Sequence, residues 1–396
     1  MKKESLNVDQ AVRERYSAAS QAREAALCCP VSYDRKYLEV IPKEVIERDY
    51  GCGDPSRYLK KGETVLDLGS GGGKICFIAA QIVGAEGRVI GVDTNDDMLR
   101  LARDASMMVS EKIGYQNVEF RKGMIQDLKL DRSLLNQWLS DHPVQCEKDL
   151  RELESYIAEL KREKVMIADE SVDVVVSNCV LNLVDTEKKD QMFSEIYRVL
   201  KPGGRAVISD IVADEAVPLE LQNDPELWSG CISGAYQEAE FLEAFESAGF
   251  SCVSLDKRDA EPWQIVDGIE FRSVTVVAYK PLSEEKDSDC NEALIYKGPF
   301  KVVQDDRGQV FLRGERVAVS HEIFEEYTRN DLEKHFFAIS PADKIDVEDA
   351  PEFILEEGIM LRSPQSTKAA TTSSSSCCGT SERDSDHKRS PSGGCC

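Results

Sequence analysis

The chain has 396 residues, of which 41% are hydrophobic and 31% are charged, and it carries a formal net charge of -24 at pH 7. This length exceeds the usual size of one hydrophobic core and predicts two folded domains with a tail. The acidic balance argues against nucleic acid as a partner, because phosphates would be repelled, and no apolar run approaches the ~20 residues that span a membrane. No apolar segment follows the basic residues at the start, so we expect a cytoplasmic chain with reduced thiols.

Helical spacing predicts an N-terminal helical cap over residues 1–58. The first helix is expected over residues 1–27 and ends before Cys28 and Cys29, and a second amphipathic helix is expected over residues 36–49. Both predicted helices precede the first buried strand.

Buried strands alternate with helices through residues 59–281, which we expect to form one domain. The predicted strands are residues 63–68, 88–93, 118–123, 172–177 and 205–210, and the predicted helices between them are residues 74–83, 96–113 and 187–200. This alternation predicts an α/β fold in which helices cover both faces of a parallel sheet. Residues 131–168 interrupt it with helical spacing, so we expect an inserted helical hairpin that serves packing or dimer contact.

The composition changes after Pro281, where a polar linker begins. Residues 290–362 contain an Asp-Asp-Arg-Gly turn at 305–308 and predict a small β-rich or α+β appendage. Residues 363–396 are dominated by Ser, Thr and Gly and predict a disordered tail. The tail ends in two cysteine pairs: Cys377, Cys378, Cys395 and Cys396. Such pairs on a flexible arm can capture thiophilic ions, and the alternative interpretation is an expendable tail.

A glycine-rich turn, Gly-Ser-Gly-Gly-Gly at 69–73, follows the first strand and opens a helix. Glycines there let the backbone turn tightly and approach a ligand, as in dinucleotide sites, which place pyrophosphate on the helix N-terminus. Asp67 precedes the first glycine by two residues and would attract a cationic ligand group but repel pyrophosphate. Asp93 ends the second strand, where an acid can bind ribose hydroxyls. An NAD site is the alternative interpretation of this turn.

Three motifs resemble those of class I S-adenosylmethionine methyltransferases: Glu-Thr-Val-Leu-Asp-Leu-Gly-Ser-Gly-Gly-Gly at 63–73, Val-Ile-Gly-Val-Asp at 89–93 and Val-Leu-Lys-Pro-Gly-Gly at 199–204. The resemblance covers residues 60–212 and implies a Rossmann-like sheet that binds S-adenosyl-L-methionine. It implies that Asp67 lies near the amino group of the methionine part and that Asp93 binds the ribose. The further expected cofactor contacts are Gly69, Gly71, Gly73, Met98, Ile125 and Gln126, together with Asn178.

A closer resemblance, over residues 10–281, is to the arsenite methyltransferase family. It is carried by Tyr-Gly-Cys-Gly at 50–53, Val-Ser-Asn-Cys-Val-Leu-Asn-Leu at 176–183, Leu-Trp-Ser-Gly-Cys-Ile-Ser-Gly-Ala at 227–235 and a late strand at 270–276. The family implies four catalytic cysteines: Cys52, Cys179, Cys231 and one of Cys28 and Cys29, of which we favour Cys29. The helical cap would thus contribute substrate cysteines. By the same resemblance Cys29 and Cys52 form a redox pair, which a reducing thiol, thioredoxin or glutathione, would restore.

As(III) prefers soft thiolates in a trigonal pyramid, which needs three sulfurs from separate segments. Cys179 follows the fourth strand, whose carboxyl end faces the cofactor crevice in such sheets. We therefore predict an arsenite methyltransferase for arsenic detoxification, which transfers a methyl group from S-adenosylmethionine to As(III) bound by Cys52, Cys179 and Cys231. Cys28 and the four tail cysteines would be additional metalloid ligands.

Two alternatives stay open. A methyltransferase on a small organic acceptor, such as a quinone precursor, predicts activity that survives the loss of Cys179 and Cys231. A non-catalytic metalloid-binding protein predicts arsenite binding without methyl transfer. Four further cysteines match no motif and are interpreted as packing residues: Cys76, Cys146, Cys252 and Cys290.

Overall fold

The computed structural model describes residues 8–21, 24, 31–282, 287–355 and 359–368. The chain divides into two units: Met1–Lys286 with Gln304–Gln309, and Asp287–Val303 with Val310–Cys396. Among the described residues, no helix is long and apolar enough to cross a membrane.

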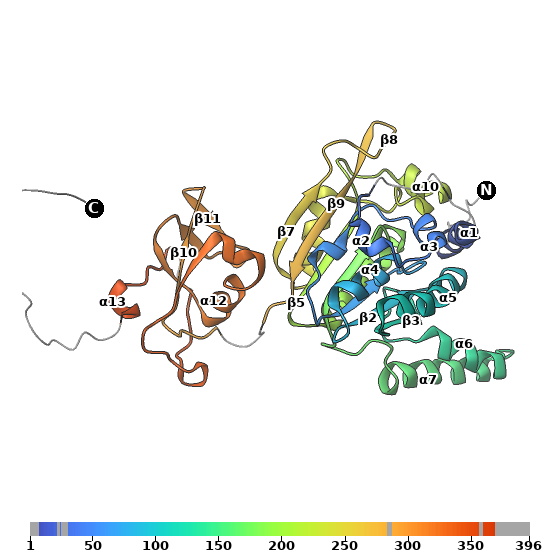
Figure 1. Cartoon of the computed structure of the whole chain (residues 1–396), viewed down its shortest axis with the longest axis horizontal. Coiled ribbons are helices and arrows are strands. Elements are labelled where there is room, and N and C mark those ends of the chain that lie inside the picture. Colours follow the sequence, from blue (N-terminus) through green and yellow to red (C-terminus); the bar gives the residue numbers. More distant parts are fainter. Residues whose placement is uncertain (1–7, 22–23, 25–30, 283–286, 356–358, 369–396) are drawn as a thin grey trace, which may run out of the picture. The chain divides into compact units, whose positions relative to one another are not determined.

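The centre of the first unit is a sheet whose strands follow the order β3-β2-β1-β4-β5-β9-β7 (Figure 1). Its parallel part consists of β3 (Val118–Lys122), β2 (Arg88–Asp93), β1 (Thr64–Leu68), β4 (Val172–Asn178) and β5 (Leu200–Ala213). The other end is formed by β9 (Ile269–Tyr279), which is antiparallel to both β5 and β7 (Ser251–Arg258). The short strands β6 (Tyr236–Gln237) and β8 (Gln264–Val266) pair with β5 and β9. The predicted α/β fold is confirmed, and the antiparallel end is an addition that the alternation of strands and helices did not predict.

The sheet has two apolar faces because its strands are almost continuously hydrophobic. Leu66 and Leu68 of β1 pack in one buried cluster with Phe193, whereas Val65 packs in another with Phe77. Since successive side chains of a strand point to opposite faces, such a strand needs helices on both sides. One face is covered by α8 (Lys189–Val199) and α11 (Glu238–Ser247), and the other by α4 (Lys74–Val83) and α5 (Asp96–Ile113).

The N-terminal cap differs from the prediction. α1 spans Val8–Gln21, but the second predicted helix is two short ones, α2 (Arg35–Leu38) and α3 (Lys43–Glu47). Pro42 is the N-cap of α3. Proline lacks an N–H and disfavours helical backbone in the residue before it, so a helix does not continue through this position.

The segment 131–168 contains α6 (Arg132–Asp141) and α7 (Glu147–Glu163), which lie side by side in Figure 1. Leu135 and Leu160 are buried together between them, and the rings of Trp138 and Tyr156 stack with centroids 5.0 Å apart. A narrow apolar stripe therefore holds the two helices together.

Two further short helices follow β5: α9 (Leu219–Gln222) and α10 (Pro225–Ser229).

The second unit is built on a three-stranded antiparallel sheet. β10 (Ala293–Tyr296) lies between β13 (Arg316–Ala318) and β14 (Phe336–Ile339). β11 (Val302–Gln304) and β12 (Val310–Leu312) pair on either side of the predicted turn, whose residues Gln304–Gln309 are counted with the first unit. In this turn Gly308 N–H donates to the Asp305 carbonyl at 3.0 Å. The helices of this unit are α12 (His321–Tyr327) and α13 (Pro364–Thr367), and α13 lies within the segment expected to be a disordered tail.

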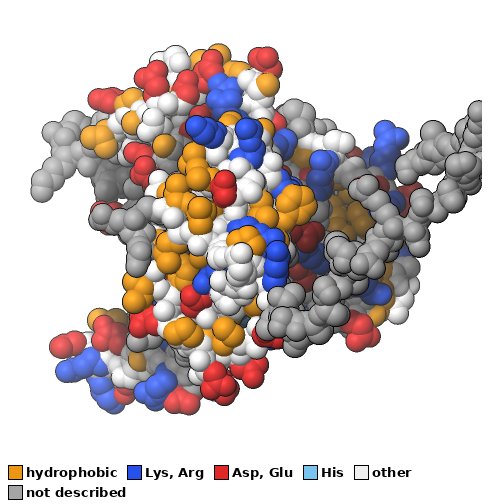
Figure 2. Space-filling view, turned by 90° about the vertical axis from the view of Figure 1, so that its left-hand side faces the viewer, with side chains coloured by type: hydrophobic (Ala, Val, Ile, Leu, Met, Phe, Trp, Pro, Cys, Tyr) orange, Lys and Arg blue, Asp and Glu red, His pale blue; other side chains and the backbone are white. Residues whose placement is uncertain are grey.

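Figure 2 shows acidic and basic side chains interspersed with hydrophobic ones on the face that it displays. The formal net charge of -24 therefore does not produce one uninterrupted acidic surface on that face.

The glycine turn generates a stability prediction. Gly73 and Gly62 both have positive φ, of 89° and 85°, a conformation that costs an L side chain roughly 1–2 kcal/mol. A Cβ on Gly73 would also lie 2.8 Å from Phe120 and 3.0 Å from Phe77, whereas one on Gly62 would meet nothing within 4 Å. We expect Gly73→Ala to lower the free energy of unfolding by roughly 1–3 kcal/mol more than Gly62→Ala, because overpacking adds to the backbone strain. Urea denaturation of the two variants checks this, and equal losses would contradict it.

Candidate active site

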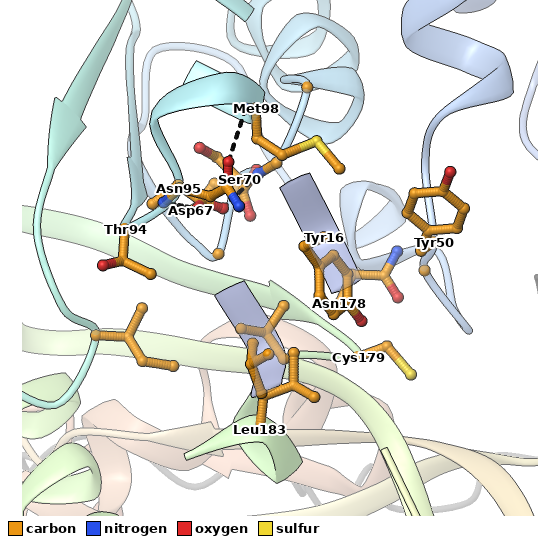
Figure 3. A pocket seen from close by; sticks show the side chains of 18 of the residues that line it. Tyr16, Tyr50, Asp67, Ser70, Thr94, Asn95, Met98, Asn178, Cys179 and Leu183 are labelled. Carbon is orange, nitrogen blue, oxygen red and sulfur yellow. Dashed lines mark hydrogen bonds between the residues drawn. The ribbon is translucent and has the colours of Figure 1, made fainter. Parts of the chain in front are cut away.

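A cavity of about 270 Å³ lies at the carboxyl ends of β1, β2 and β4 (Figure 3). β1 has β2 on one side and β4 on the other, and crevices that bind ligands form where the strand order reverses in this way. In Figure 3, Asp67, Ser70 and Asn95 gather on one side of the view, whereas Asn178 and Cys179 lie on the other.

Asp67 is the buried acid of the cavity. It is 2% exposed, and the Cys76 thiol donates to its Oδ2 at 3.1 Å. Burial raises the pKa of Asp67 to about 7, against the lowering effect of the Cys76 hydrogen bond. Burial, followed by the charge of Asp67, raises the pKa of Cys76 well above its usual value, so this thiol stays protonated as a donor. A cationic ligand group in the cavity would favour the ionised form of Asp67.

Asp93 ties the glycine turn to β2. Its carboxylate accepts hydrogen bonds from Gly71 N–H at 2.9 Å and Asn95 N–H at 2.8 Å. Burial raises the pKa of Asp93, and these backbone hydrogen bonds oppose the shift. The acid therefore lies at the cavity wall in a fixed position.

The cavity fits S-adenosylmethionine on three observations. Ser70 Oγ is buried and has no hydrogen-bond partner within the described part of the chain. A Cβ on Gly71 would meet nothing within 4 Å, so the turn faces open space. Met98, Ile125 and Gln126 line the same cavity and are almost fully buried, so they offer an apolar wall with one amide. The buried acid Asp67 suits the positively charged part of this cofactor, and the apolar wall suits its aromatic part. The Ser70 hydroxyl is available for a hydrogen bond to the cofactor.

The predicted cofactor residues all line this cavity except Gly73. Gly73 instead caps α4 in the left-handed conformation, close to the Phe77 and Phe120 rings. Its place in the motif is explained by packing between the turn and the sheet.

The side-chain amide of Asn178 holds the Cys52 segment. Its Oδ1 accepts hydrogen bonds from Cys52 N–H and Gly53 N–H, both at 2.9 Å, and its Nδ2 donates to the Gly53 carbonyl at 2.9 Å. A Cβ on Gly51 would lie 2.0 Å from Asn178, and one on Gly53 would lie 2.3 Å from Ser209. The glycines on either side of Cys52 therefore allow this close approach.

A second asparagine of the same motif holds the Cys231 segment. Asn182 Nδ2 donates to the carbonyls of Ile211 at 2.6 Å and Cys231 at 3.3 Å. The Cys231 thiol in turn donates to the Cys179 carbonyl at 3.3 Å. A Cβ on Gly234 would lie 2.0 Å from the Asn182 carbonyl, which explains the glycine in the Ser-Gly-Ala part of this motif.

The three predicted substrate cysteines share one buried apolar cluster, in which Cys52, Cys179 and Cys231 are 2%, 5% and 3% exposed. Cys179 and Cys231 both have a φ of 64°, a region that costs a non-glycine residue roughly 1–3 kcal/mol and is often found at functional sites. Their sulfurs and that of Cys52 do not form a group of ligand atoms within 4.8 Å of one another. The three cysteines therefore lie in one cluster, but their sulfurs are not all close enough to bind one atom at the same time.

Sequence reasoning missed the part that α1 plays. Tyr16 lines the cavity, and burial, followed by the nearby Cys231 and Cys179 thiols, raises its pKa well above the usual value. α1 is attached on the cofactor side, where Asn95 Nδ2 donates to Ser17 Oγ at 3.0 Å. Val8, Ala11, Val12 and Tyr16 have the spacing of one helix face, but spacing alone does not distinguish a core from a cavity wall.

Arg15 attaches α1 on the other side. Its Nη1 donates to Ser229 Oγ at 3.0 Å and to the Glu226 carbonyl at 2.8 Å, so α1 is fixed to the helix that precedes Cys231. Asp49, which also lines the cavity, pairs with the buried Lys74.

Several predicted residues lie outside the described part of the chain: Cys28, Cys29, Cys377, Cys378, Cys395 and Cys396. Their roles stay predictions. The packing interpretation is wrong for Cys146, which is exposed directly before α7.

Comparisons with known proteins agree with this geometry. A family described as a methyltransferase domain matches residues 59–168 and 152–249, and a domain of unknown function (DUF8838) matches residues 283–372. An arsenite methyltransferase of Aquipseudomonas alcaligenes is 33% identical over 284 residues, which are 68% of this chain and 71% of that protein. An arsenite methyltransferase of Halobacterium salinarum is 36% identical over 244 residues, which are 59% of this chain. The matched part spans about half, 51%, of the length of that protein.

A solved structure is similar as well. The crystal structure of an arsenic (III) S-adenosylmethionine methyltransferase from Chlamydomonas reinhardtii has 26% sequence identity to the chain and a TM-score of 0.53. The similarity covers 82% of this chain and 99% of that one.

The sheet order, the glycine turn and the two acids at the strand ends define a class I S-adenosylmethionine-dependent methyltransferase. Within that class, the chain belongs to the arsenite methyltransferase family.

Asp67 generates a prediction about pH. Its pKa is about 7 without ligand, so the carboxyl is mostly neutral below pH 7. To pair with the amino group of S-adenosylmethionine, as the family resemblance implies, it would have to lose its proton. We therefore expect the affinity for this cofactor to fall as pH decreases through 7, by roughly tenfold per pH unit well below the pKa. Calorimetric titrations between pH 5.5 and 7.5 measure this, and Asp67→Asn should bind more weakly with a nearly flat profile. A flat wild-type profile would show that Asp67 does not contact the charged group.

Proposed function

We propose that this protein methylates arsenite, with S-adenosylmethionine as the methyl donor and the thiolates of Cys52, Cys179 and Cys231 as ligands of As(III). The observation that carries this proposal is the arrangement around Asn178. Its side chain holds the Cys52 segment, while the next residue, Cys179, both lines the cavity and packs with Cys231. A thiophilic substrate held by these residues would lie beside the methyl donor.

The residues of the chain supply orientation rather than acid–base catalysis. When bound, S-adenosylmethionine supplies a methyl group on a positively charged sulfur. Asp67 is placed to pair with a cationic group, and Asp93 holds the glycine turn in position. As(III) carries a lone pair, so no residue has to remove a proton from the attacking atom. Fixing two reactants in this way can contribute roughly 7–11 kcal/mol to lowering the barrier.

Binding of As(III) has two requirements at the cysteines. The three thiols must lose their protons, which metalloid binding itself promotes because the ligands are thiolates. The sulfurs must also move together, since they are not all within 4.8 Å of one another.

The buried cysteine cluster favours this function over the alternatives. A small organic acceptor would have no use for three thiols beside the cofactor cavity, and a protein that only binds metalloids would not need the buried acid Asp67 within that cavity. The reducing thiol, thioredoxin or glutathione, and the Cys29–Cys52 redox pair are supported by the family resemblance alone.

Substitution of the cysteines tests the proposal. We expect purified wild-type protein with As(III), a thiol and labelled S-adenosylmethionine to form methylated arsenicals. Cys179→Ser and Cys231→Ser should each reduce this by at least ~100-fold, because a hydroxyl is a poor ligand for a soft metalloid, while cofactor binding persists.

The control is Cys146→Ser, which changes an exposed cysteine and should retain wild-type activity. Full formation of methylated arsenicals by Cys179→Ser would show that Cys179 is not a ligand of As(III). Failure of the wild type to bind or methylate As(III), with the cofactor bound, would favour an organic acceptor. Arsenite binding without methyl transfer in the wild type, with the cofactor bound, would favour a protein that only binds metalloids.

Asn178→Ala tests the positioning of Cys52. The substitution leaves the N–H groups of Cys52 and Gly53 without their acceptor, at a cost of about 1–3 kcal/mol for each buried group. We expect the affinity for As(III) to fall by roughly 10- to 100-fold, and to fall more than the affinity for S-adenosylmethionine.

Asn117→Ala is the matched control, because the Asn117 side chain also makes two hydrogen bonds to the backbone, as donor to the carbonyls of Ala80 and Gly84, but does not line the cavity. An equal loss of As(III) affinity in both variants would indicate a general loss of stability instead of a displaced Cys52.

A further inference from the structure

The second unit contains a cluster of metal-ligating side chains that the proposed methyl transfer does not use. Cys290, Glu292 and His321 each offer one ligand atom, and these atoms all lie within 4.8 Å of one another. Within the described ranges of the chain, no other three His, Cys, Asp or Glu side chains form such a group. Cys290 and Glu292 are 3% and 7% exposed, whereas His321 is partly exposed.

Strand pairing brings these residues together. In the β10–β13 pair, Ala293 lies opposite Ala318, so Glu292, just before β10, meets the residues just after β13. Val319 N–H donates to the Glu292 carbonyl at 3.4 Å, and His321 follows two residues later. The juxtaposition therefore follows from the register of the sheet.

An ion pair and hydrogen bonds fix the backbone around the cluster. Arg362 pairs with Asp289 at 2.6 Å, and its Nε donates to the Glu292 carbonyl at 3.3 Å. His321 N–H donates to the Ser288 carbonyl at 2.8 Å. Side chains on a backbone held in this way are positioned before any ligand arrives.

The geometry is close to that of a tetrahedral metal site. His321 Nδ1 and Glu292 Oε2 are 2.9 Å apart, whereas two ligands at about 2.0–2.1 Å from a tetrahedral zinc ion would be separated by about 3.3 Å. A small opening of this pair and an approach of the Cys290 sulfur by at most about 1 Å would complete three of the four positions.

The types of the three ligand side chains favour zinc over calcium, magnesium and As(III). One thiolate, one imidazole and one carboxylate are the ligands of zinc, whereas calcium and magnesium prefer oxygen ligands alone. As(III) would require more than the single thiol that this cluster offers.

We propose that Cys290, Glu292 and His321 bind one zinc ion, with the fourth coordination position open on the side of His321. Binding displaces the proton of the Cys290 thiol, so zinc uptake releases protons. In catalytic zinc sites, three protein ligands likewise leave one position for water or a substrate.

His321→Gln is the sharpest test, because it removes one ligand and leaves all 13 cysteines in place. The full-length protein is freed of metal and titrated with zinc against a chromophoric chelator. We expect the variant to bind one equivalent fewer than the wild type, or to bind that equivalent at least ~100-fold more weakly. The matched control is His335→Gln, which changes an exposed histidine of the same unit and should bind as the wild type does.

Cobalt substitution tests the sulfur ligand. Cys290→Ser should weaken the thiolate-to-cobalt charge-transfer absorption, whereas Cys146→Ser should not. If Cys290→Ser does not fold, as judged by circular dichroism, Glu292→Gln replaces it, because its amide keeps the shape of the side chain while losing the anionic ligand. Zinc stoichiometry and affinity in His321→Gln that equal those of the wild type would overturn the proposal and leave an ordinary His–Glu hydrogen bond beside a buried cysteine.

Discussion

The candidate active site depends on the side-chain amide of Asn178. Three hydrogen bonds fix the segment around Cys52 to the end of β4, where the following residue is Cys179. Asn182, one turn further on, holds Cys231 by its carbonyl. Segments from three distant parts of the sequence thus converge on a single short motif, and the cofactor cavity and the thiol cluster share Cys179 as a common wall.

The cofactor half of the fold was predictable because its signals are local. The ranges of β2, α4 and α5 agree with the sequence prediction residue for residue, since apolar periodicity and glycine turns act over a few residues. The antiparallel pairing of β9 with β5 and β7 was missed. The direction and partner of a strand depend on distant contacts, and the pattern of one segment does not contain them.

The site was only partly predictable for the same reason. Motif resemblance identified Asp67, Asp93 and the three cysteines, but the contribution of Tyr16 and the shared left-handed backbone of Cys179 and Cys231 appear only in three dimensions. A cysteine with positive φ has no sequence signal, because its neighbours impose that conformation against its own preference. Cys290 matches no sequence motif and was interpreted as packing, and it is buried. Its proximity to His321 arises through strand register, which has no local sequence signal.

α1 is attached on both sides of the site, to Asn95 at the start of α5 and to Ser229 beside the Cys231 motif. Tyr16, between these attachments, lines the cavity and lies near the Cys231 thiol. The same helix therefore forms part of the cavity wall and contacts the helix that precedes Cys231. A substitution that displaced α1 would disturb the cofactor side and the thiol side of the site together.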